Sequence, residues 1–179
     1  MSQSQVCIVL SAMQRWARHV SCILFTALLG LSLQAATVHA EPVIVTISGM
    51  TSKTATGDLN LTLSEFEAIG MQELETSTPW HKEKTRFSGV SGSKLSAYLK
   101  VTGKNVKARA LNDYEIVMPA SDLLIEGFIF ATRIDGKPMS VREKGPIFVL
   151  YPFDQNPELT NEVIFGRSIW QLRALHFGQ

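Results

Sequence analysis

Polar and aromatic side chains are concentrated in three segments of the sequence, which are centred on Asn112-Asp113, Tyr151 and Trp170. Strand formation alone does not require such residues there. An amide both donates and accepts hydrogen bonds, a carboxylate accepts them, and an aromatic ring offers a flat apolar face. A small-molecule site can be built from groups of these types.

Each segment also has a purely structural interpretation. Asn and Asp both tolerate the left-handed backbone region, so Asn112-Asp113 can simply be a hairpin turn. A tryptophan in a strand usually belongs to the core, and Trp170 lies in a stretch with strand character. The residues alone leave both interpretations open.

Catalytic and metal sites of the common kinds are absent from the sequence after residue 40. Both cysteines, Cys7 and Cys22, precede that point, which excludes a disulfide, a thiolate metal site and a cysteine nucleophile from the remainder. Of the two later histidines, His81 is expected in an exposed polar loop and His176 at the end of the last strand, pointing outward. There is no Gly-x-Ser-x-Gly elbow, no glycine-rich phosphate loop and no His-Glu-x-x-His motif. We therefore expect neither a zinc site nor a histidine base.

The N-terminus has the pattern of a secretory signal peptide. Arg15 and Arg18 precede an apolar run over residues 22–36, and the small side chain of Ala40 suits cleavage after that residue. The run is shorter than the roughly 20 residues of a membrane span, so an uncleaved anchor is the less favoured alternative. The two arginines are not adjacent, unlike those of a twin-arginine signal. We expect an exported protein that begins at Glu41 and does not insert into the membrane.

The charge and length of residues 41–179 exclude some classes of function and indicate the number of domains. All 17 Lys and Arg residues except Arg15 and Arg18 lie there, together with all 16 Asp and Glu residues, so this part has a formal charge of −1. Proteins that bind nucleic acid normally show a clustered basic surplus, and we expect no nucleic-acid partner. The length suits one domain with its own hydrophobic core.

Strand patterns dominate residues 41–179. β-branched runs and period-two alternation predict strands at residues 43–48, 59–63, 71–77, 106–111, 114–118, 125–134, 146–151 and 168–177. Asp135-Gly136 is typical of a hairpin turn. Short helices are expected at residues 64–67, where Ser64 and Glu67 have capping-box spacing, at residues 93–101, and as a single turn at residues 119–124. Many strands with a few short helices predict an α+β domain.

Seven short motifs follow one another in a fixed order after residue 86. They are F-S-G-V (87–90), L-x-x-Y-L (95–99), A-L-N-D-Y (110–114), M-P-x-x-D (118–122), A-x-R-x-D-G (131–136), G-P with Y-P-x-D (145–154) and W-Q-L (170–172). This series resembles the molybdopterin-binding domain of the sulfite oxidase family. It is most similar to small exported members that bind a pterin and report to a membrane-bound cyclic-di-GMP enzyme. The resemblance covers residues 43–177 and implies a sulfite oxidase-like fold, mostly β with a few short helices.

One departure from the family's pattern decides the function that the resemblance implies. Sulfite oxidase-like enzymes bind molybdenum through a cysteine ahead of the F-S-G-V segment, whereas residues 74–86 contain no cysteine. A hydroxyl of Thr76, Ser77 or Thr78 is a poor substitute for a soft thiolate. The resemblance therefore implies a non-enzymatic pterin-binding sensor without molybdenum, which docks on the periplasmic domain of an inner-membrane diguanylate cyclase or phosphodiesterase. A molybdenum-cofactor oxidoreductase, or a degenerate subunit of one, is the alternative, and a ligand-free adaptor domain is the third.

The resemblance also implies which residues would bind the polar edge of a pterin. That edge resembles the edge of guanine, with two adjacent N–H donors beside a carbonyl acceptor. Asp113 and Asn112 are the candidates for the donors, because a carboxylate accepts from both and an amide serves either side. Arg133 is the candidate donor to the carbonyl.

The flat faces of a pterin need aromatic surface. Trp170 is the first candidate for stacking, followed by Trp80 and Tyr151. Arg167 would hold a phosphate or another side-chain group of the ligand.

Overall fold

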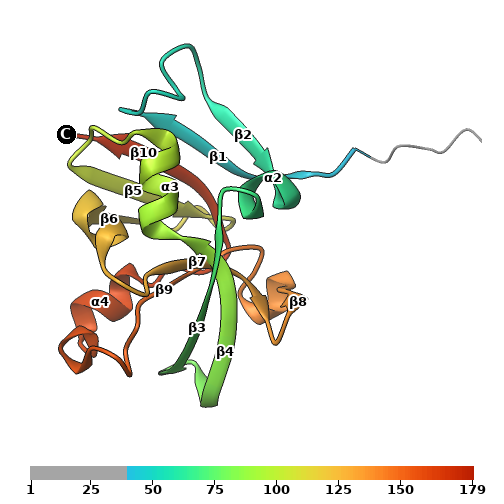
Figure 1. Ribbon diagram of the computed structural model, residues 1–179, viewed down its shortest axis with the longest axis vertical. Helices are drawn as coiled ribbons and strands as arrows, with labels where there is room; N and C mark the ends of the chain where they lie inside the picture. Colours follow the sequence, from blue (N-terminus) through green and yellow to red (C-terminus); the bar gives the residue numbers. More distant parts are fainter. Residues whose placement is uncertain (1–39) are drawn as a thin grey trace, which may run out of the picture. The chain divides into compact units, whose positions relative to one another are not determined.

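The computed structural model describes residues 40–179. The signal peptide expected at residues 1–40 therefore lies outside the described residues, except for Ala40, and its cleavage stays a prediction. Contacts unite Glu41–Gln179 in one unit, which Figure 1 traces from the blue strand β1 to the red strand β10. No helix within residues 40–179 combines the length and the hydropathy needed to cross a lipid bilayer.

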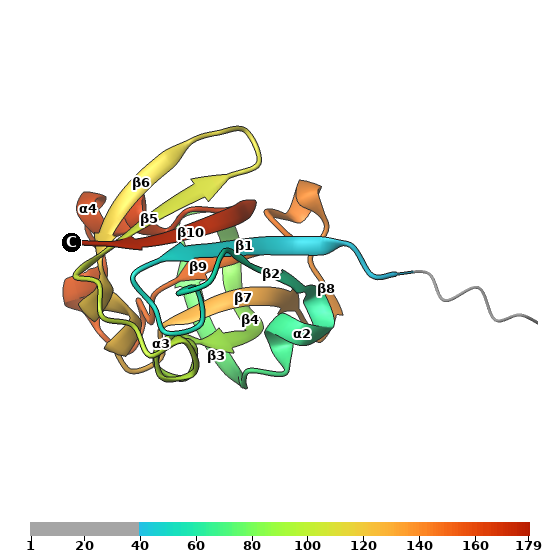
Figure 2. The ribbon, with the colours of Figure 1, turned by 90° about the horizontal axis from the view of Figure 1, so that it is seen from above.

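The first of two sheets contains the first and last strands of the unit. Its order is β2 (Leu59–Thr62), β1 (Val43–Gly49), β10 (Leu172–Gly178), β5 (Asn105–Ala110) and β6 (Glu115–Pro119). β1 and β10 run parallel, with Thr46 opposite Ala174, whereas the other neighbouring strands are antiparallel. Figure 2 shows these strands side by side. Alternate residues point to opposite sides, so Val45 and Ile47 are buried while the other face meets solvent.

The second sheet is built on a long hairpin of β3 (Met71–Thr78) and β4 (His81–Ser91). β4 pairs with β7 (Ile129–Ile134), which also pairs with β8 (Lys137–Pro138) and β9 (Phe148–Leu150). The prediction of a polar loop at residues 81–86 is wrong, because these residues form the first half of β4. The side of the hairpin that is partly buried there carries Thr76, Thr78 and His81, which are polar, so the sequence lacks the apolar alternation by which strands are recognised. The turn predicted at Asp135-Gly136 is confirmed, since it joins β7 to β8.

The helices are short and connect the strands. They are α2 (Leu63–Glu67), α3 (Gly92–Leu99) and α4 (Glu162–Arg167), with the 3-10 helices η1 (Ala120–Leu124), η2 (Val141–Glu143) and η3 (Pro157–Leu159). η1 confirms the turn expected at residues 119–124. α3 confirms the helix expected at residues 93–101, although it ends earlier because Lys100 takes a left-handed conformation with φ of 51°. α4 was not expected; the Asn161 side chain caps it by accepting from two helix N–H groups.

The capping box of α2 uses a different pair from the predicted one. Two such patterns overlap in the sequence, Thr62-x-x-Glu65 and Ser64-x-x-Glu67. The structure uses the first: Thr62 Oγ1 accepts from the Glu65 N–H, and the Glu65 carboxylate accepts from the Thr62 N–H at 2.9 Å. The prediction of Ser64 as the cap is wrong, because Ser64 already lies inside the helix and Glu67 pairs with Arg133 instead.

Two clusters of apolar side chains form the core. The larger is contributed by both sheets and the helices and includes Ile47, Phe66 and Phe130, and the smaller surrounds Phe148. Trp80, between β3 and β4, packs against both clusters. Burial of apolar surface contributes about 25 cal/mol per Å², so these contacts hold the tip of the β3–β4 hairpin in place.

Two strands begin four residues later than predicted, and the second shift shapes the site. The strand expected from residue 125 begins at Ile129, because a turn with positive φ at Gly127 precedes it. The strand expected from residue 168 begins at Leu172, because Gln171 has a φ of 53° and its N–H donates to the Lys144 carbonyl at 2.9 Å. Residues 168–171 are therefore an irregular segment. The mostly β architecture with a few short helices, an α+β domain, is confirmed.

Candidate functional site

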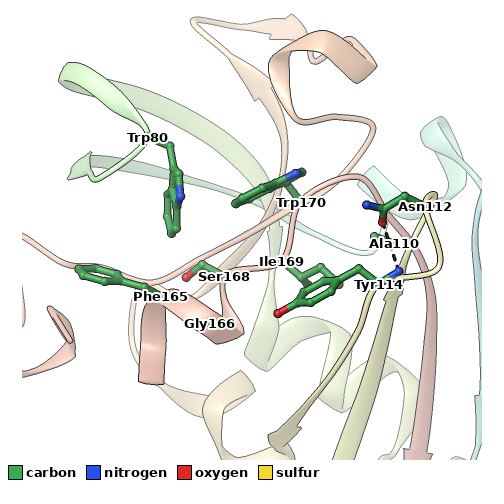
Figure 3. A pocket seen from close by; sticks show the side chains of 9 residues that line it. All are labelled: Trp80, Ala110, Asn112, Tyr114, Phe165, Gly166, Ser168, Ile169 and Trp170. Atoms are coloured by element: carbon green, nitrogen blue, oxygen red, sulfur yellow. Dashed lines mark hydrogen bonds between the residues drawn. The ribbon is translucent and has the colours of Figure 1, made fainter. Parts of the chain in front are cut away.

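A cavity of about 460 Å³ lies where three segments distant in sequence converge (Figure 3). One is the tip of the β3–β4 hairpin, the second is the β5–β6 hairpin, and the third runs from the end of α4 to Trp170. The lining residues are Trp80, Ala110, Asn112, Tyr114, Phe165, Gly166, Ser168, Ile169 and Trp170. Aromatic and apolar side chains dominate this lining, and none of these residues carries a charge.

Trp80 is held among other rings, whereas Trp170 remains accessible. The centroid of the Trp80 ring lies 5.4 Å from that of Phe148 and 6.0 Å from that of Phe165, both edge-to-face. Trp170 contacts Trp80 at 5.7 Å with 68° between the ring planes, and 38% of Trp170 is exposed. Figure 3 shows the Tyr114 ring extending toward the cavity from the β5–β6 hairpin. A planar ligand can therefore stack on a preformed aromatic surface.

Lys144 lies over the ring of Trp170, and His81 lies near enough to this lysine for its pKa to be affected. Lys144 Nζ lies 4.9 Å from the centroid of the Trp170 ring, a cation–π distance. Burial, followed by the positive charge of Lys144, lowers the pKa of His81 below its ordinary value. His81 Nδ1 lies 2.9 Å from Thr78 Oγ1. The prediction of an exposed loop histidine is wrong, because His81 is partly buried on β4, against Phe87.

The β5–β6 turn presents Asn112 and Tyr114 to the cavity. Asp113 has a φ of 62° and its N–H donates to the Ala110 carbonyl at 3.1 Å, while the Tyr114 N–H donates to Asn112 Oδ1 at 3.2 Å. The hairpin turn is confirmed, and Asn112 also lines the cavity. Asp113 does not reach it: its side chain is 74% exposed and lies 3.8 Å from Arg173.

Tyr151 and Arg167 belong to a buried polar network rather than to the cavity lining. The Tyr151 hydroxyl donates to Asp122 Oδ2 at 2.8 Å, and Arg167 Nη1 donates to the same oxygen at 3.0 Å. Burial, followed by the Asp122 carboxylate, raises the pKa of Tyr151 above its ordinary value. Arg167 ends α4, so its ion pair fixes the start of the segment that leads to Trp170. Neither residue lines the cavity, because both side chains are committed to Asp122, and their predicted ligand roles stay predictions.

Arg133 lies on β7 and pairs with α2, away from the cavity. Its Nε and Nη2 donate to the two carboxylate oxygens of Glu67 at 2.8 and 2.7 Å, and Thr132 Oγ1 donates to Glu67 Oε1 at 2.6 Å. Burial raises the pKa of Glu67, but the hydrogen bonds from Arg133 and Thr132 outweigh it and leave that pKa below its ordinary value. This bidentate pair occupies the guanidinium, and Arg133 does not line the cavity, so its predicted contact with a pterin carbonyl stays a prediction.

Asp154 fixes the hairpin tip that carries Trp80. Its Oδ2 accepts from the Ser77 N–H at 3.1 Å and lies 3.7 Å from Lys84 Nζ, and its own N–H donates to Thr76 Oγ1 at 3.2 Å. These contacts join the β3–β4 hairpin to the loop after β9. The Y-P-x-D motif therefore positions one wall of the cavity, a role that the sequence did not indicate.

Of the seven predicted site residues, the structure brings together Trp170, Trp80 and Asn112. Sequence reasoning missed Tyr114 and Phe165 as lining residues. The sequence could have indicated Tyr114 as a lining residue, because it lies two positions after Asn112 and such spacing can place both side chains on one side of a hairpin. Phe165 had none, since it lies in the unexpected helix α4.

The residues present do not fit molybdenum bound by a protein ligand. The sequence has no cysteine after Cys22, and Thr76 is fully buried with its hydroxyl hydrogen-bonded inside the structure. The Thr78 hydroxyl is engaged with His81. Among the residues from 40 onward, no three His, Cys, Asp or Glu side chains lie close enough together to hold a metal ion. The aromatic lining fits a planar organic ring instead.

Comparisons with known proteins bear on the fold. No protein-family model matches the sequence, and no curated protein sequence matches it. Among solved structures, the fold is similar to that of the sulfane dehydrogenase SoxCD from Paracoccus pantotrophus, with a TM-score of 0.52 and 14% sequence identity. The similarity covers 75% of this chain and 37% of that one, so this chain spans little more than a third of its structural neighbour. The likeness concerns the fold alone and is consistent with the sulfite oxidase-like, molybdopterin-binding type of fold that the ordered motifs predict.

Proposed function

We propose that residues 41–179 bind a planar ligand of the pterin class in the aromatic cavity, without metal chemistry. The observation that carries the proposal is the contact between Trp80 and Trp170, which leaves the Trp170 ring accessible on a fixed support. Stacking of a base-like ring on an aromatic side chain contributes about 1 to 3 kcal/mol. A cavity of about 460 Å³ can contain a bicyclic ring with a short side chain.

Recognition of the polar edge of the pterin would rest on neutral groups. Asn112 Oδ1 accepts from the Tyr114 N–H, which leaves the Asn112 Nδ2 donors for the ring carbonyl. The Tyr114 hydroxyl is suited to accept from the 2-amino group. No charged side chain lines the cavity in the described part of the chain, so a neutral ring is favoured over an ionised one.

The function proposed for this pterin-binding protein is that of an exported sensor. The motif series resembles small exported pterin-binding members of the sulfite oxidase family, and the N-terminal sequence has the pattern of a signal peptide. In this role the protein docks on the periplasmic domain of an inner-membrane diguanylate cyclase or phosphodiesterase. The ligand changes docking only to the extent that it binds the docked and free states with different affinity.

A molybdenum-cofactor oxidoreductase, or a degenerate subunit of one, is the second candidate. The similarity of the fold to that of a sulfane dehydrogenase favours it. The lack of any cysteine after Cys22 weighs against it, because the protein would contribute no thiolate to the metal.

Isothermal titration of the exported protein with neopterin and dihydroneopterin tests the proposal. We expect saturable binding at one site per chain, accompanied by a change in tryptophan fluorescence. Elemental analysis of protein exported from a host that makes molybdenum cofactor separates the two candidates, since stoichiometric molybdenum would favour the oxidoreductase. Failure of both pterins to bind would contradict the proposal.

A further inference from the structure

A second and wider hollow lies on the solvent-exposed face of the first sheet. Its volume is about 900 Å³, and its lining includes residues of β1, β10 and β5 together with Glu115 of β6 and Met139, Ser140 and Val141. We call it the sheet groove; the residues that matter here are Ile44, Lys107, Arg109, Leu111, Val141 and Arg173. None of these residues lines the aromatic cavity.

Three cationic side chains on the neighbouring strands β5 and β10 line the sheet groove, together with the carboxylates of Asp58 and Glu115. Lys107 Nζ lies 3.6 Å from the Glu115 carboxylate, and Arg173 Nη2 lies 3.8 Å from Asp113 Oδ1. All four side chains of these two pairs are largely exposed, so the pairs are weak and exchange readily with other partners. Within residues 40–179, Arg109 forms no ion pair. Because a guanidinium binds a carboxylate through two parallel hydrogen bonds, Arg109 offers an open carboxylate site.

Exposed apolar side chains lie beside these charges. Val43 is 55% exposed, Val141 52% and Leu111 43%, and all three line the groove. A partner that fits must therefore carry both carboxylates and apolar groups along an extended surface. We propose that the sheet groove binds an extended acidic segment of a protein partner, with carboxylates on Arg109 and Arg173 and apolar side chains on Leu111 and Val141.

Charge disfavours two other occupants of the sheet groove. A second copy would offer only Asp58 and Glu115 as carboxylates from its own groove, and Glu115 is already paired with Lys107. The chain's own residues 1–40 contain Arg15 and Arg18 but no Asp or Glu, so they supply no carboxylate. An acidic segment from another protein satisfies the cations of the groove, as neither of these does.

The β5–β6 hairpin connects the sheet groove to the aromatic cavity. Arg109 and Leu111 line the groove, whereas Ala110, Asn112 and Tyr114 alternate with them and line the cavity. A ligand that orders the hairpin from one side can change binding on the other, and the effect is reciprocal. This coupling rests on the proposed pterin-binding function, but binding in the sheet groove does not.

Fluorescence polarisation with a labelled peptide of alternating glutamate and valine tests the sheet groove in the absence of pterin. We expect saturable binding that weakens as the NaCl concentration rises, and no binding of the matched lysine–valine peptide. Arg109→Glu should weaken binding about tenfold or more, because attraction becomes repulsion, and Arg109→Gln should weaken it less. Lys82→Glu reverses an exposed charge on β4, outside the groove, and should leave the affinity unchanged.

Three results would overturn the proposal: equal affinity for the acidic and basic peptides, equal effects of Arg109→Glu and Lys82→Glu, or Arg109-dependent binding of single-stranded RNA or phosphatidylglycerol vesicles in place of the acidic peptide. Thermal unfolding of each variant checks that the sheet remains folded, and Arg109→Gln supplies the test if the charge reversal unfolds it. Because no pterin is present, the outcome is independent of pterin binding, which the titration with neopterin decides separately.

Discussion

Replacing Trp170 by alanine removes the ring on which a pterin is expected to stack. The ring is 38% exposed and supported edge-to-face by Trp80, so it is accessible and fixed in orientation. Stacking on such a ring contributes about 1 to 3 kcal/mol. We therefore expect Trp170→Ala to weaken neopterin binding by roughly 5-fold to 150-fold, measured by isothermal titration calorimetry.

The same substitution also costs stability, which the assay must take into account. Trp170 contacts the rings of Trp80 at 5.7 Å and Phe148 at 6.2 Å. Each aromatic pair contributes about 0.5 to 1.5 kcal/mol, so the free energy of unfolding should fall by about 1 to 3 kcal/mol. Urea unfolding of the variant measures this fall, and binding is then compared at a temperature where both proteins are folded.

Tyr98→Ala is a matched control for Trp170→Ala. Tyr98 is also 38% exposed, and Lys53 Nζ lies 4.8 Å from its ring centroid, as Lys144 Nζ lies 4.9 Å from that of Trp170. Tyr98 belongs to α3 and does not line the cavity, so its loss should leave neopterin affinity unchanged. Unchanged affinity in Trp170→Ala, or an equal loss in both variants, would refute the assignment of Trp170 to the site.

Three further predictions follow from groups that the structure places outside the cavity. Tyr151→Phe removes the hydroxyl that donates to Asp122 and should lower the free energy of unfolding by about 1.5 to 3 kcal/mol in urea. Arg133→Gln breaks the pair with Glu67 and should lower it by a similar amount, about 1.5 to 3 kcal/mol, while neopterin affinity stays unchanged; a large loss of affinity would return Arg133 to the site. The pKa of His81 is lowered on folding, so the unfolded chain binds the proton more readily, and the melting temperature should fall as the pH drops below about 6.5; a His81→Gln variant that falls equally steeply would contradict this.

The strands and turns were largely readable from the sequence, because local patterns specify them. The Asn112-Asp113 turn and the Asp135-Gly136 turn both lie where their backbone preferences indicate. Residues 81–86 were not readable as a strand, since the partly buried side of that hairpin carries Thr76, Thr78 and His81 and no apolar alternation develops. The period-two pattern thus predicts a strand only where the buried side of it is apolar.

The site was only partly readable, because side-chain partners distant in sequence decide it. Trp170 was assigned to a strand, yet the positive φ of Gln171 delays that strand and leaves Trp170 at the cavity. Arg133 has the type expected of a ligand-binding residue, but Glu67 occupies it. Nothing in the local sequence around Arg133 indicates that partner.

The most direct test of pterin binding without molybdenum is the mass spectrum of the small molecule bound to the protein after extraction from its native host. We expect a pterin in stoichiometric amount, and no molybdenum in the same sample. Stoichiometric molybdenum, or protein that carries no pterin and takes none up when neopterin or dihydroneopterin is added, would contradict the account.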